Sequence, residues 1–247
     1  MRIYGMEKLS LVDYDGKVAT TLFTGSCNFR CGFCHNSPLV LDFKNLPTIS
    51  EEEIFSYLKK RVGIIEGVCI SGGEPTLEKD LANFIEKIKS LGYSVKLDTN
   101  GTNPEIVKAL INNGLIDYLA MDIKNDRENY AKIIGFDNYD TKKVEETVDF
   151  LLNGTFPYEF RTTLIKEFHT QENIAKIGEW IKGANKYFLQ KFKDSESCIQ
   201  SHLSAVDEKT VLEFLDILKK DIPNTYLRGY GIWFCRALFG FATQRIR

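Results

Sequence analysis

Strand-like and helix-like segments alternate along almost the whole of this 247-residue chain, and this alternation restricts the folds that it can adopt. Neighbouring parallel strands need a long connection, usually a helix, so the alternation predicts a parallel sheet with right-handed crossovers. Strands are predicted at residues 18–24, 68–71, 95–99, 118–123, 159–164, 187–190 and 225–227. Six strand–helix units and a final strand are too few for a closed eight-fold barrel. We therefore expect an α/β fold of the open, partial (β/α)6 barrel type.

Several predicted helices carry recognisable end signals. Ser50 followed by Glu53 has the pattern of a capping box. Asn103 before Pro104 predicts a helix with Asn103 as its N-cap and proline at its first position. Apolar residues at helical spacing predict further helices within 81–91, 144–151, 174–181 and 211–218.

The composition argues against several classes of protein. The formal net charge of −2 offers no basic field for nucleic acid or for an anionic membrane. No apolar run approaches the roughly 20 residues that span a bilayer, and the N-terminus lacks a secretory pattern. Six cysteines, three of them clustered, are more typical of a reducing compartment than of a disulfide framework. We expect a cytoplasmic protein that binds neither nucleic acid nor membrane, in which Cys69, Cys198 and Cys235 are ordinary residues.

Three of the cysteines lie within eight residues, directly after the first predicted strand. Cys27, Cys31 and Cys34 have the spacing C-x3-C-x2-C. Thiolates are the usual ligands of iron–sulfur clusters, and a four-iron cluster held by three of them leaves one iron open. A structural zinc ion usually takes four ligands in two separated pairs, and the adjacent Cys34 and His35 cannot easily face one metal. Zinc binding with His35, or three inert cysteines, are the alternatives.

The cysteine motif, with the aromatic Phe33 before its last cysteine, resembles the signature of the radical S-adenosylmethionine (SAM) superfamily. Further motifs follow in the order that the superfamily shows. They are Ser-Gly-Gly-Glu-Pro at 71–75, Asp-Thr-Asn-Gly at 98–101 and Met-Asp-Ile-Lys at 121–124. Together these motifs resemble the glycyl-radical-enzyme activases.

Two local features point to one subfamily of these activases. The Cys-His-Asn ending at 34–36 and the opening segment 11–16 are similar to the activases of anaerobic ribonucleoside-triphosphate reductase. The resemblance covers about residues 1–230, which we expect to form one radical SAM domain. The aromatic-rich tail, 231–247, lies outside the resemblance.

The resemblance also implies cofactors and partners. The cofactors are a [4Fe–4S] cluster and SAM, whose reductive cleavage gives a 5′-deoxyadenosyl radical that removes a hydrogen atom. The implied partners are anaerobic ribonucleotide reductase and an electron donor of the flavodoxin or ferredoxin type. One alternative is action on another glycyl radical enzyme or on a small molecule, as in a 7-carboxy-7-deazaguanine synthase. A second is a non-catalytic iron–sulfur or zinc protein for electron transfer or sensing.

The motifs follow predicted strands at their carboxyl ends, where ligands bind in sheets of this kind. We therefore expect them to form one site. Gly72 and Gly73 lack side chains, so the backbone there can approach a ligand closely. The resemblance implies that this turn contacts the methionine amino group of SAM, with Glu74 as an anionic group nearby.

Two carboxylates, Asp98 and Asp122, end neighbouring predicted strands. They repel each other unless a cation or a hydrogen-bond donor lies between them. The resemblance implies that they bind a monovalent cation beside SAM and that Lys124 offers its ammonium group to the same ligand. Arg161, in the next strand, can hold a carboxylate with its fixed guanidinium.

Residues beside the last cysteine complete the predicted site. Phe33 and Asn36 are expected to line the adenine pocket, and His35 to tune the cluster by hydrogen bonding from outside its ligand set. His169 and His202 lie in loop-like regions further along the chain. A related activase has a histidine that contacts SAM, so cofactor contact and a solvated surface position are both open for these two.

Overall fold

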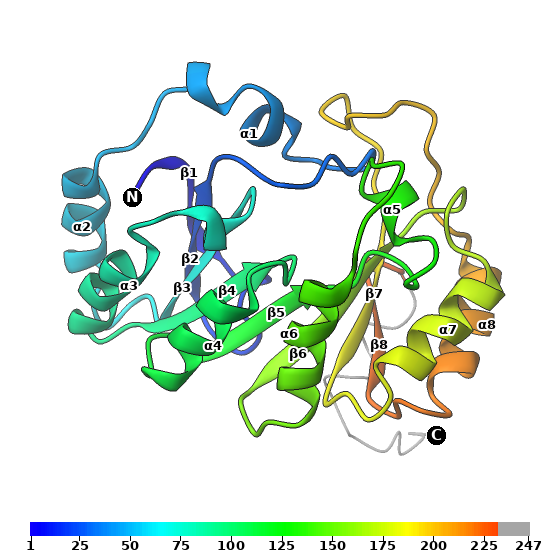
Figure 1. Cartoon of the computed structure of the whole chain (residues 1–247). Helices are drawn as coiled ribbons and strands as arrows, with labels where there is room; N and C mark the ends of the chain where they lie inside the picture. Colours follow the sequence, from blue (N-terminus) through cyan, green and yellow to red (C-terminus); the bar gives the residue numbers. More distant parts are fainter. Residues whose placement is uncertain (232–247) are drawn as a thin grey trace, which may run out of the picture.

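Figure 1 shows the computed structural model of the chain, which describes residues 1–231. The strands form one sheet in chain order, from β1 at one edge to β8 at the other. β1 is antiparallel to β2, and every later neighbouring pair is parallel. The strands are β1 (Ile3–Ser10), β2 (Ala19–Thr24), β3 (Gly67–Gly72), β4 (Ser94–Thr99), β5 (Tyr118–Asp122), β6 (Tyr158–Leu164), β7 (Tyr187–Lys191) and β8 (Thr225–Arg228).

A long helix follows each parallel strand from β2 to β7. These helices are α2 (Glu51–Lys59), α3 (Leu81–Ser90), α4 (Pro104–Asn112), α6 (Lys142–Leu152), α7 (Gln171–Trp180) and α8 (Glu208–Leu218). Two short helices, α1 (Ser37–Leu41) and α5 (Tyr130–Ile133), and the 3-10 turns Phe43–Asn45 and Pro75–Leu77 lie in the connections. Because β1 and β8 stand at opposite ends of the strand order, the sheet is not closed. The predicted α/β fold with an open, partial (β/α)6 barrel is confirmed.

Strand β1 was not predicted from the sequence. Within residues 1–231 its one partner strand is β2, apart from an isolated bridge between Ile3 and Ile49, and most of its residues are half-buried or exposed. Its register against β2 shifts twice, between Ile3 and Gly5 and between Glu7 and Ser10. This irregular, partly exposed edge strand lacks the short apolar-rich run by which the other strands were predicted.

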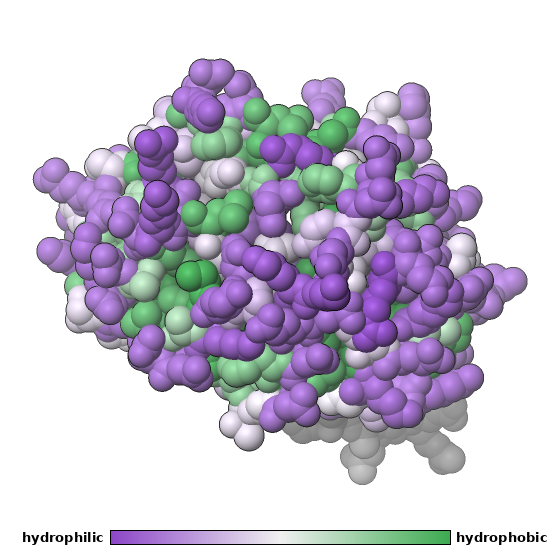
Figure 2. Space-filling model, viewed as in Figure 1, coloured by the Kyte–Doolittle hydropathy of each residue, from purple (hydrophilic) through white to green (hydrophobic). Residues whose placement is uncertain are grey.

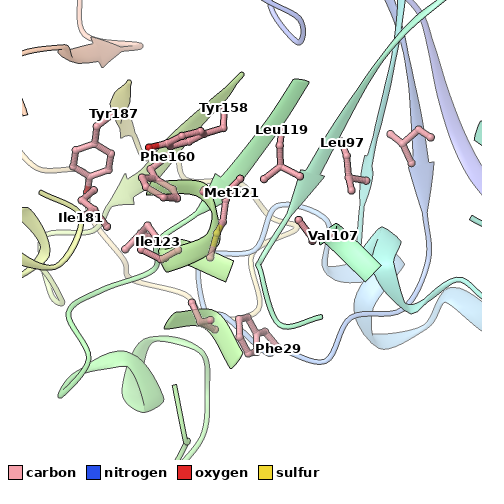
Figure 3. Packing of buried hydrophobic residues seen from close by; sticks show 14 of the residues in the cluster. Phe29, Leu97, Val107, Leu119, Met121, Ile123, Tyr158, Phe160, Ile181 and Tyr187 are labelled. Atoms are coloured by element: carbon pink, nitrogen blue, oxygen red, sulfur yellow. The ribbon is translucent and has the colours of Figure 1, made fainter. Parts of the chain in front are cut away.

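The two faces of the sheet carry different chemistry. Leu97 of β4 and Phe160 of β6 belong to the hydrophobic core (Figure 3). Asp98 and Arg161 are the next residues of the same strands, so their side chains point to the opposite, inner face of the barrel. Apolar packing and the charged groups are thus separated by the alternation within each strand.

The predicted helix caps are confirmed only in part. The Ser50 hydroxyl accepts a hydrogen bond from the Glu53 N–H at 3.1 Å, which caps α2. In a full capping box the Glu53 side chain would also accept from the Ser50 N–H, and the described residues do not form this second bond. Asn103 stands at the N-cap position but makes no side-chain cap bond, and its amide nitrogen donates to the Thr76 hydroxyl at 2.8 Å. Pro104 begins α4 as predicted.

The turn after β3 packs directly on the loop that follows β2. The Gly73 N–H donates to the Thr24 carbonyl at 3.0 Å, and the Glu74 N–H donates to the Ser26 carbonyl at 2.8 Å. A Cβ at Gly73 would lie 1.7 Å from the Ser26 carbonyl oxygen, and one at Gly72 would lie 2.4 Å from backbone atoms of Thr24. The contact between these two backbones therefore requires both glycines, whether or not a ligand approaches them.

The last strand ends close to the limit of the described residues. After Arg228 the chain continues to Tyr230, which is buried and whose hydroxyl donates to the Val206 carbonyl at 3.3 Å. Apart from Gly231, the predicted tail 231–247 lies outside the described residues. No helix within residues 1–231 is long and apolar enough to cross a membrane. The face seen in Figure 2 is largely hydrophilic, with apolar residues in scattered patches.

We predict that Gly73→Ala destabilises the protein by about 3 kcal/mol, because the new methyl group overlaps the Ser26 carbonyl and forces two loops apart. Denaturant unfolding of the metal-free protein measures this free energy. Gly5→Ala is the matched control, since its Cβ would meet Phe23 at an ordinary 3.4 Å. Equal free energies of unfolding for the two variants would contradict the packing argument.

Candidate active site

A cavity of about 820 Å³, its open mouth included, lies at the carboxyl ends of the parallel strands. Every residue that the sequence predicted for the site lines it. These residues are Cys27, Cys31, Cys34, Phe33, Asn36, Gly72, Gly73, Glu74, Asp98, Asp122, Lys124 and Arg161. The cysteine loop forms one wall, and the ends of β3 to β6 form the rest.

The cysteine loop is held in shape by backbone and side-chain contacts. The Arg30 guanidinium donates to the carbonyl oxygens of Cys27 at 2.6 Å and Phe29 at 2.7 Å. Phe29 is buried, and its ring packs edge-on against Tyr130. From the segment after β7, the Gln200 N–H donates to the Gly32 carbonyl at 2.8 Å. These contacts order the loop without engaging the thiols.

Cys31 is buried and Cys27 and Cys34 are half-buried, which disfavours ionisation of their thiols. Burial raises the pKa of Cys27 to about 11 and that of Cys31 to about 12, and it raises the pKa of Cys34 as well. Repulsion from the neighbouring thiolates raises the pKa of Cys31 further, and the Lys124 ammonium lowers it. Three adjacent thiolates therefore need additional positive charge, which iron ions supply.

The donor set fits an iron–sulfur cluster better than a single ion. Thiolates favour soft metal centres such as iron–sulfur clusters, zinc and Cu(I). Across residues 1–231 there is no group of three or more His, Cys, Asp or Glu side chains that could hold one metal ion. The thiolates of a cluster can lie further apart than the ligands of one ion, because each thiolate binds a different iron.

The residues after Cys34 are attached to the cavity wall. The His35 ring stacks on Phe192 with 5.5 Å between the ring centroids, and its Nε2 contacts the Lys193 carbonyl. The Asn36 amide donates to the Gly72 carbonyl at 3.2 Å. The contacts of His35 and Asn36 fix both side chains against the cavity wall.

Five charged side chains form a chain of ion pairs on the inner face of the sheet, which we call the charge ladder. Its contacts are Lys96 Nζ to Asp98 Oδ1 at 2.6 Å, Asp98 Oδ2 to Arg161 Nη1 at 3.1 Å, Arg161 Nε to Asp122 Oδ1 at 2.8 Å and Asp122 Oδ2 to Lys124 Nζ at 2.9 Å. Three cations alternate with two anions, so the ladder carries a net positive charge.

Arg161 is the centre of the charge ladder. Strand register places it opposite Asp122 across the β5–β6 pair. Burial opposes ionisation of Asp98 and Asp122, but the Arg161 guanidinium, together with Lys96 beside Asp98 and Lys124 beside Asp122, outweighs it and lowers the pKa of both carboxyls. Arg161 is thus a cation between these two carboxylates, and a monovalent metal ion beside them stays a prediction.

Lys124 is held in place from behind. Its ammonium lies 5.6 Å from the centroid of the Phe33 ring. His169 Nε2 donates to the Lys124 carbonyl at 3.0 Å, while the Ile165 N–H donates to His169 Nδ1 at 3.0 Å. Burial lowers the pKa of His169, which favours this neutral form. His169 is therefore a buried support for Lys124, and neither His169 nor the exposed His202 lines the cavity.

Glu74 ties together the turns after β3 and β4. Its Oε1 accepts from the Thr76 N–H at 3.1 Å, the Thr76 hydroxyl at 2.6 Å and the Thr99 hydroxyl at 2.8 Å. Its Oε2 accepts from the Asn100 N–H at 2.7 Å. Burial raises the pKa of Glu74, and these hydrogen bonds oppose that change. Most of the acceptor capacity of this carboxylate is therefore used within the protein.

Three polar residues of the site were not predicted. Lys96 is 3% exposed and begins the charge ladder, and the Ser71 hydroxyl donates to Asp98 at 3.1 Å. Asn100 lines the cavity. The signal for Lys96 was its position two residues before Asp98 in a strand, which places both on one face. Asn100 lies in the motif 98–101, which was recognised without a role for this residue.

Comparison with known proteins agrees with this site. Residues 21–181 match the family model of the radical SAM superfamily. A Methanocaldococcus jannaschii protein, named as a candidate glycyl-radical enzyme activating enzyme, is 33% identical over 232 residues, or 92% of this chain and 95% of the relative. A 7-carboxy-7-deazaguanine synthase of Koribacter versatilis is 26% identical over 161 residues, or 62% of this chain and 64% of the relative.

A solved structure shares the fold at low identity. Streptococcus suis SuiB bound to SAM has a TM-score of 0.64 and 14% identity, over 85% of this chain and 52% of that one. The chain belongs to the radical SAM superfamily, because the family model covers more than half of it. It is therefore an enzyme whose cofactors are a [4Fe–4S] cluster and SAM.

We predict that the ion pairs of Asp98 lose their effect in acid. The folded pKa lies below that of a free aspartate, about 3.9, so the stabilisation is complete above about pH 5 and is lost as the pH falls. Asp98→Asn leaves Lys96 and Arg161 under-compensated and should lower the unfolding free energy at pH 7 by about 3 kcal/mol. The deficit should shrink towards pH 3.

Denaturant unfolding of the metal-free protein at several pH values tests this prediction. Glu146→Gln, which removes an exposed ion pair with Lys108, is the control and should keep the wild-type pH profile. A deficit for Asp98→Asn that stays constant from pH 7 to pH 3 would show that the carboxylate charge is not what stabilises the fold.

Proposed function

We propose that this enzyme is an activase that installs a glycyl radical in a protein partner, anaerobic ribonucleoside-triphosphate reductase. One observation supports the activase part of the proposal, and the reductase as partner rests on the resemblance of segments 11–16 and 34–36. The relative named as a candidate glycyl-radical enzyme activating enzyme matches over 95% of its own length, whereas the deazaguanine synthase matches over 64%. The likeness to the activase thus extends beyond the part of the chain that both relatives share.

The cysteine loop is the proposed holder of the cluster. Cys27, Cys31 and Cys34 line one cavity wall, and each would bind one iron. When bound, the cluster and SAM supply one electron and a carbon-centred radical that removes a hydrogen atom. The protein's part is to bind and orient these groups and to keep water away from them.

The charge ladder is the proposed binding surface for SAM. Its excess positive charge favours the carboxylate of the methionine group, and Lys124 and Arg161 are the donors that face the cavity. The Phe33 ring, packed over the Lys124 ammonium, offers an aromatic face for adenine, with Asn36 beside it. His169 would hold the backbone of Lys124 in place through its hydrogen bond to the Lys124 carbonyl.

The open barrel supports a polypeptide substrate. Residues 1–231 are used almost entirely for the barrel and its helices, and the two edge strands leave one side of the sheet open. An extended loop could enter there, and only glycine brings its Cα close without a side chain. One electron and SAM would give methionine and 5′-deoxyadenosine, with the hydrogen atom taken from the glycine Cα. The electron donor would be a flavodoxin or a ferredoxin.

A second candidate is an enzyme that acts on a small heterocycle. The relative that favours it is the deazaguanine synthase, which aligns with 62% of this chain. The same cavity and ladder would serve that reaction, so the two candidates differ in the substrate and not in the cofactors.

We predict that Lys124→Met weakens SAM binding by at least about tenfold, because it removes a charge-assisted hydrogen bond. Iron content should stay at the wild-type level, since Lys124 is not one of the proposed ligands of the cluster. Equilibrium dialysis of anaerobically reconstituted protein measures binding, and release of 5′-deoxyadenosine after dithionite reduction measures cleavage. Lys108→Met, on the exposed surface of α4, is the control. Wild-type affinity in Lys124→Met would remove the ladder from the proposed SAM site.

We predict a glycyl doublet in the paramagnetic spectrum when the reduced enzyme, SAM and anaerobic ribonucleotide reductase are mixed. The doublet arises because a Cα radical between two amides couples to its remaining hydrogen. The control omits SAM and should give no doublet. A doublet with pyruvate formate-lyase but not with the reductase would assign a different partner. Turnover of a heterocycle with no protein radical would favour the second candidate.

A further inference from the structure

Three polar side chains form a closed ring of hydrogen bonds beside Cys27. Asn100 Nδ2 donates to Asn28 Oδ1 at 2.8 Å, Asn28 Nδ2 donates to Thr102 Oγ1 at 2.8 Å, and Thr102 Oγ1 donates to Asn100 Oδ1 at 2.7 Å. The ring joins the cysteine loop to the turn after β4. Asn100 and Thr102 are only 5% and 3% exposed, whereas Asn28 is exposed, so solvent is largely excluded from the Asn100–Thr102 bond alone.

The direction of the ring is fixed by the backbone. The Thr102 N–H donates to Asn100 Oδ1 at 3.0 Å, and a backbone N–H can only donate. The atom that it meets must therefore be the amide oxygen of Asn100, which places the amide nitrogen on the opposite side. Reversing Asn28 would bring its own amide nitrogen against that of Asn100. The three donors therefore run in one sense around the ring.

The fixed amide leaves one N–H of Asn100 directed at a sulfur atom. An amide nitrogen carries two hydrogens, and Asn28 takes one of them. The same nitrogen lies 3.9 Å from Cys27 Sγ, within reach of a hydrogen bond to sulfur. The Phe29 N–H donates to the same sulfur at 3.3 Å. Cys27 Sγ thus has two N–H groups directed at it, one of them from a side chain.

We propose that Asn100 is a positioning residue that raises the reduction potential of the cluster through its N–H contact with Cys27. This inference rests on the proposal that Cys27 binds an iron. Hydrogen bonds to cluster sulfurs are among the factors that set the potential, because they stabilise the more negative, reduced state. The ring holds the amide in place through the turn after β4, whose backbone Glu74 binds. The turns after β3 and β4 would then influence the cluster without touching iron.

Replacement of Asn100 by leucine tests the proposal, because it removes the donor and keeps the side-chain volume. We expect the ratio of reduced to oxidised cluster to fall several-fold at a fixed potential, up to about tenfold, for loss of one hydrogen bond. A tenfold change corresponds to 59 mV for one electron. Thr102→Val opens the ring but leaves the amide, so a smaller shift of the same sign is expected. A redox titration followed by paramagnetic resonance, without SAM or partner, gives the potentials.

Asn103→Ala is the matched control, since its amide lies in the same turn but donates to Thr76. It should keep the wild-type potential. An unchanged potential in Asn100→Leu at full iron content would overturn the proposal. Loss of iron in both Asn100→Leu and Thr102→Val would also overturn it, because the ring would then only brace the loop. Either failure leaves the proposed activase function intact, since the glycyl doublet tests that function separately.

Discussion

The Arg161 guanidinium lies between the carboxylates of Asp98 and Asp122 and makes the charge ladder possible inside this fold. Two carboxylates on neighbouring strands would repel each other strongly in a weakly polarisable interior. With Arg161 between them both stay ionised, and Lys96 and Lys124 extend the alternation of charge on either side. The charged side chains of the ladder are therefore paired with one another without a ligand, which reduces the reorganisation that ligand binding requires.

The parts of this arrangement that follow from local chemistry could be predicted. Strands β2 to β8 show apolar residues on the face that packs on helices, so their positions and the parallel sheet were predictable. Because the carboxyl ends of parallel strands meet at one rim, motifs that follow different strands were expected to converge, and the residues that carry them do line one cavity.

The parts that depend on contacts between distant segments could not be predicted. The irregular edge strand β1 has no clear pattern of its own. The two glycines of the turn after β3 were attributed to a ligand, but their neighbours are the backbones of Thr24 and Ser26, more than forty positions away in the chain. His169 does lie in a loop, as predicted, but nothing in its local sequence shows that its ring is buried and binds the Lys124 carbonyl.

The same contacts link the motifs into one unit. The turn after β3 binds the cysteine loop through backbone hydrogen bonds, and Glu74 of that turn binds the Asn100 N–H after β4. Asn100 returns to the cysteine loop through Asn28, which closes a circuit of three segments. The three segments are therefore hydrogen-bonded to one another as well as to their own strands. Cluster, SAM and substrate would meet on segments that brace each other, which favours the fixed orientation that a reactive radical requires.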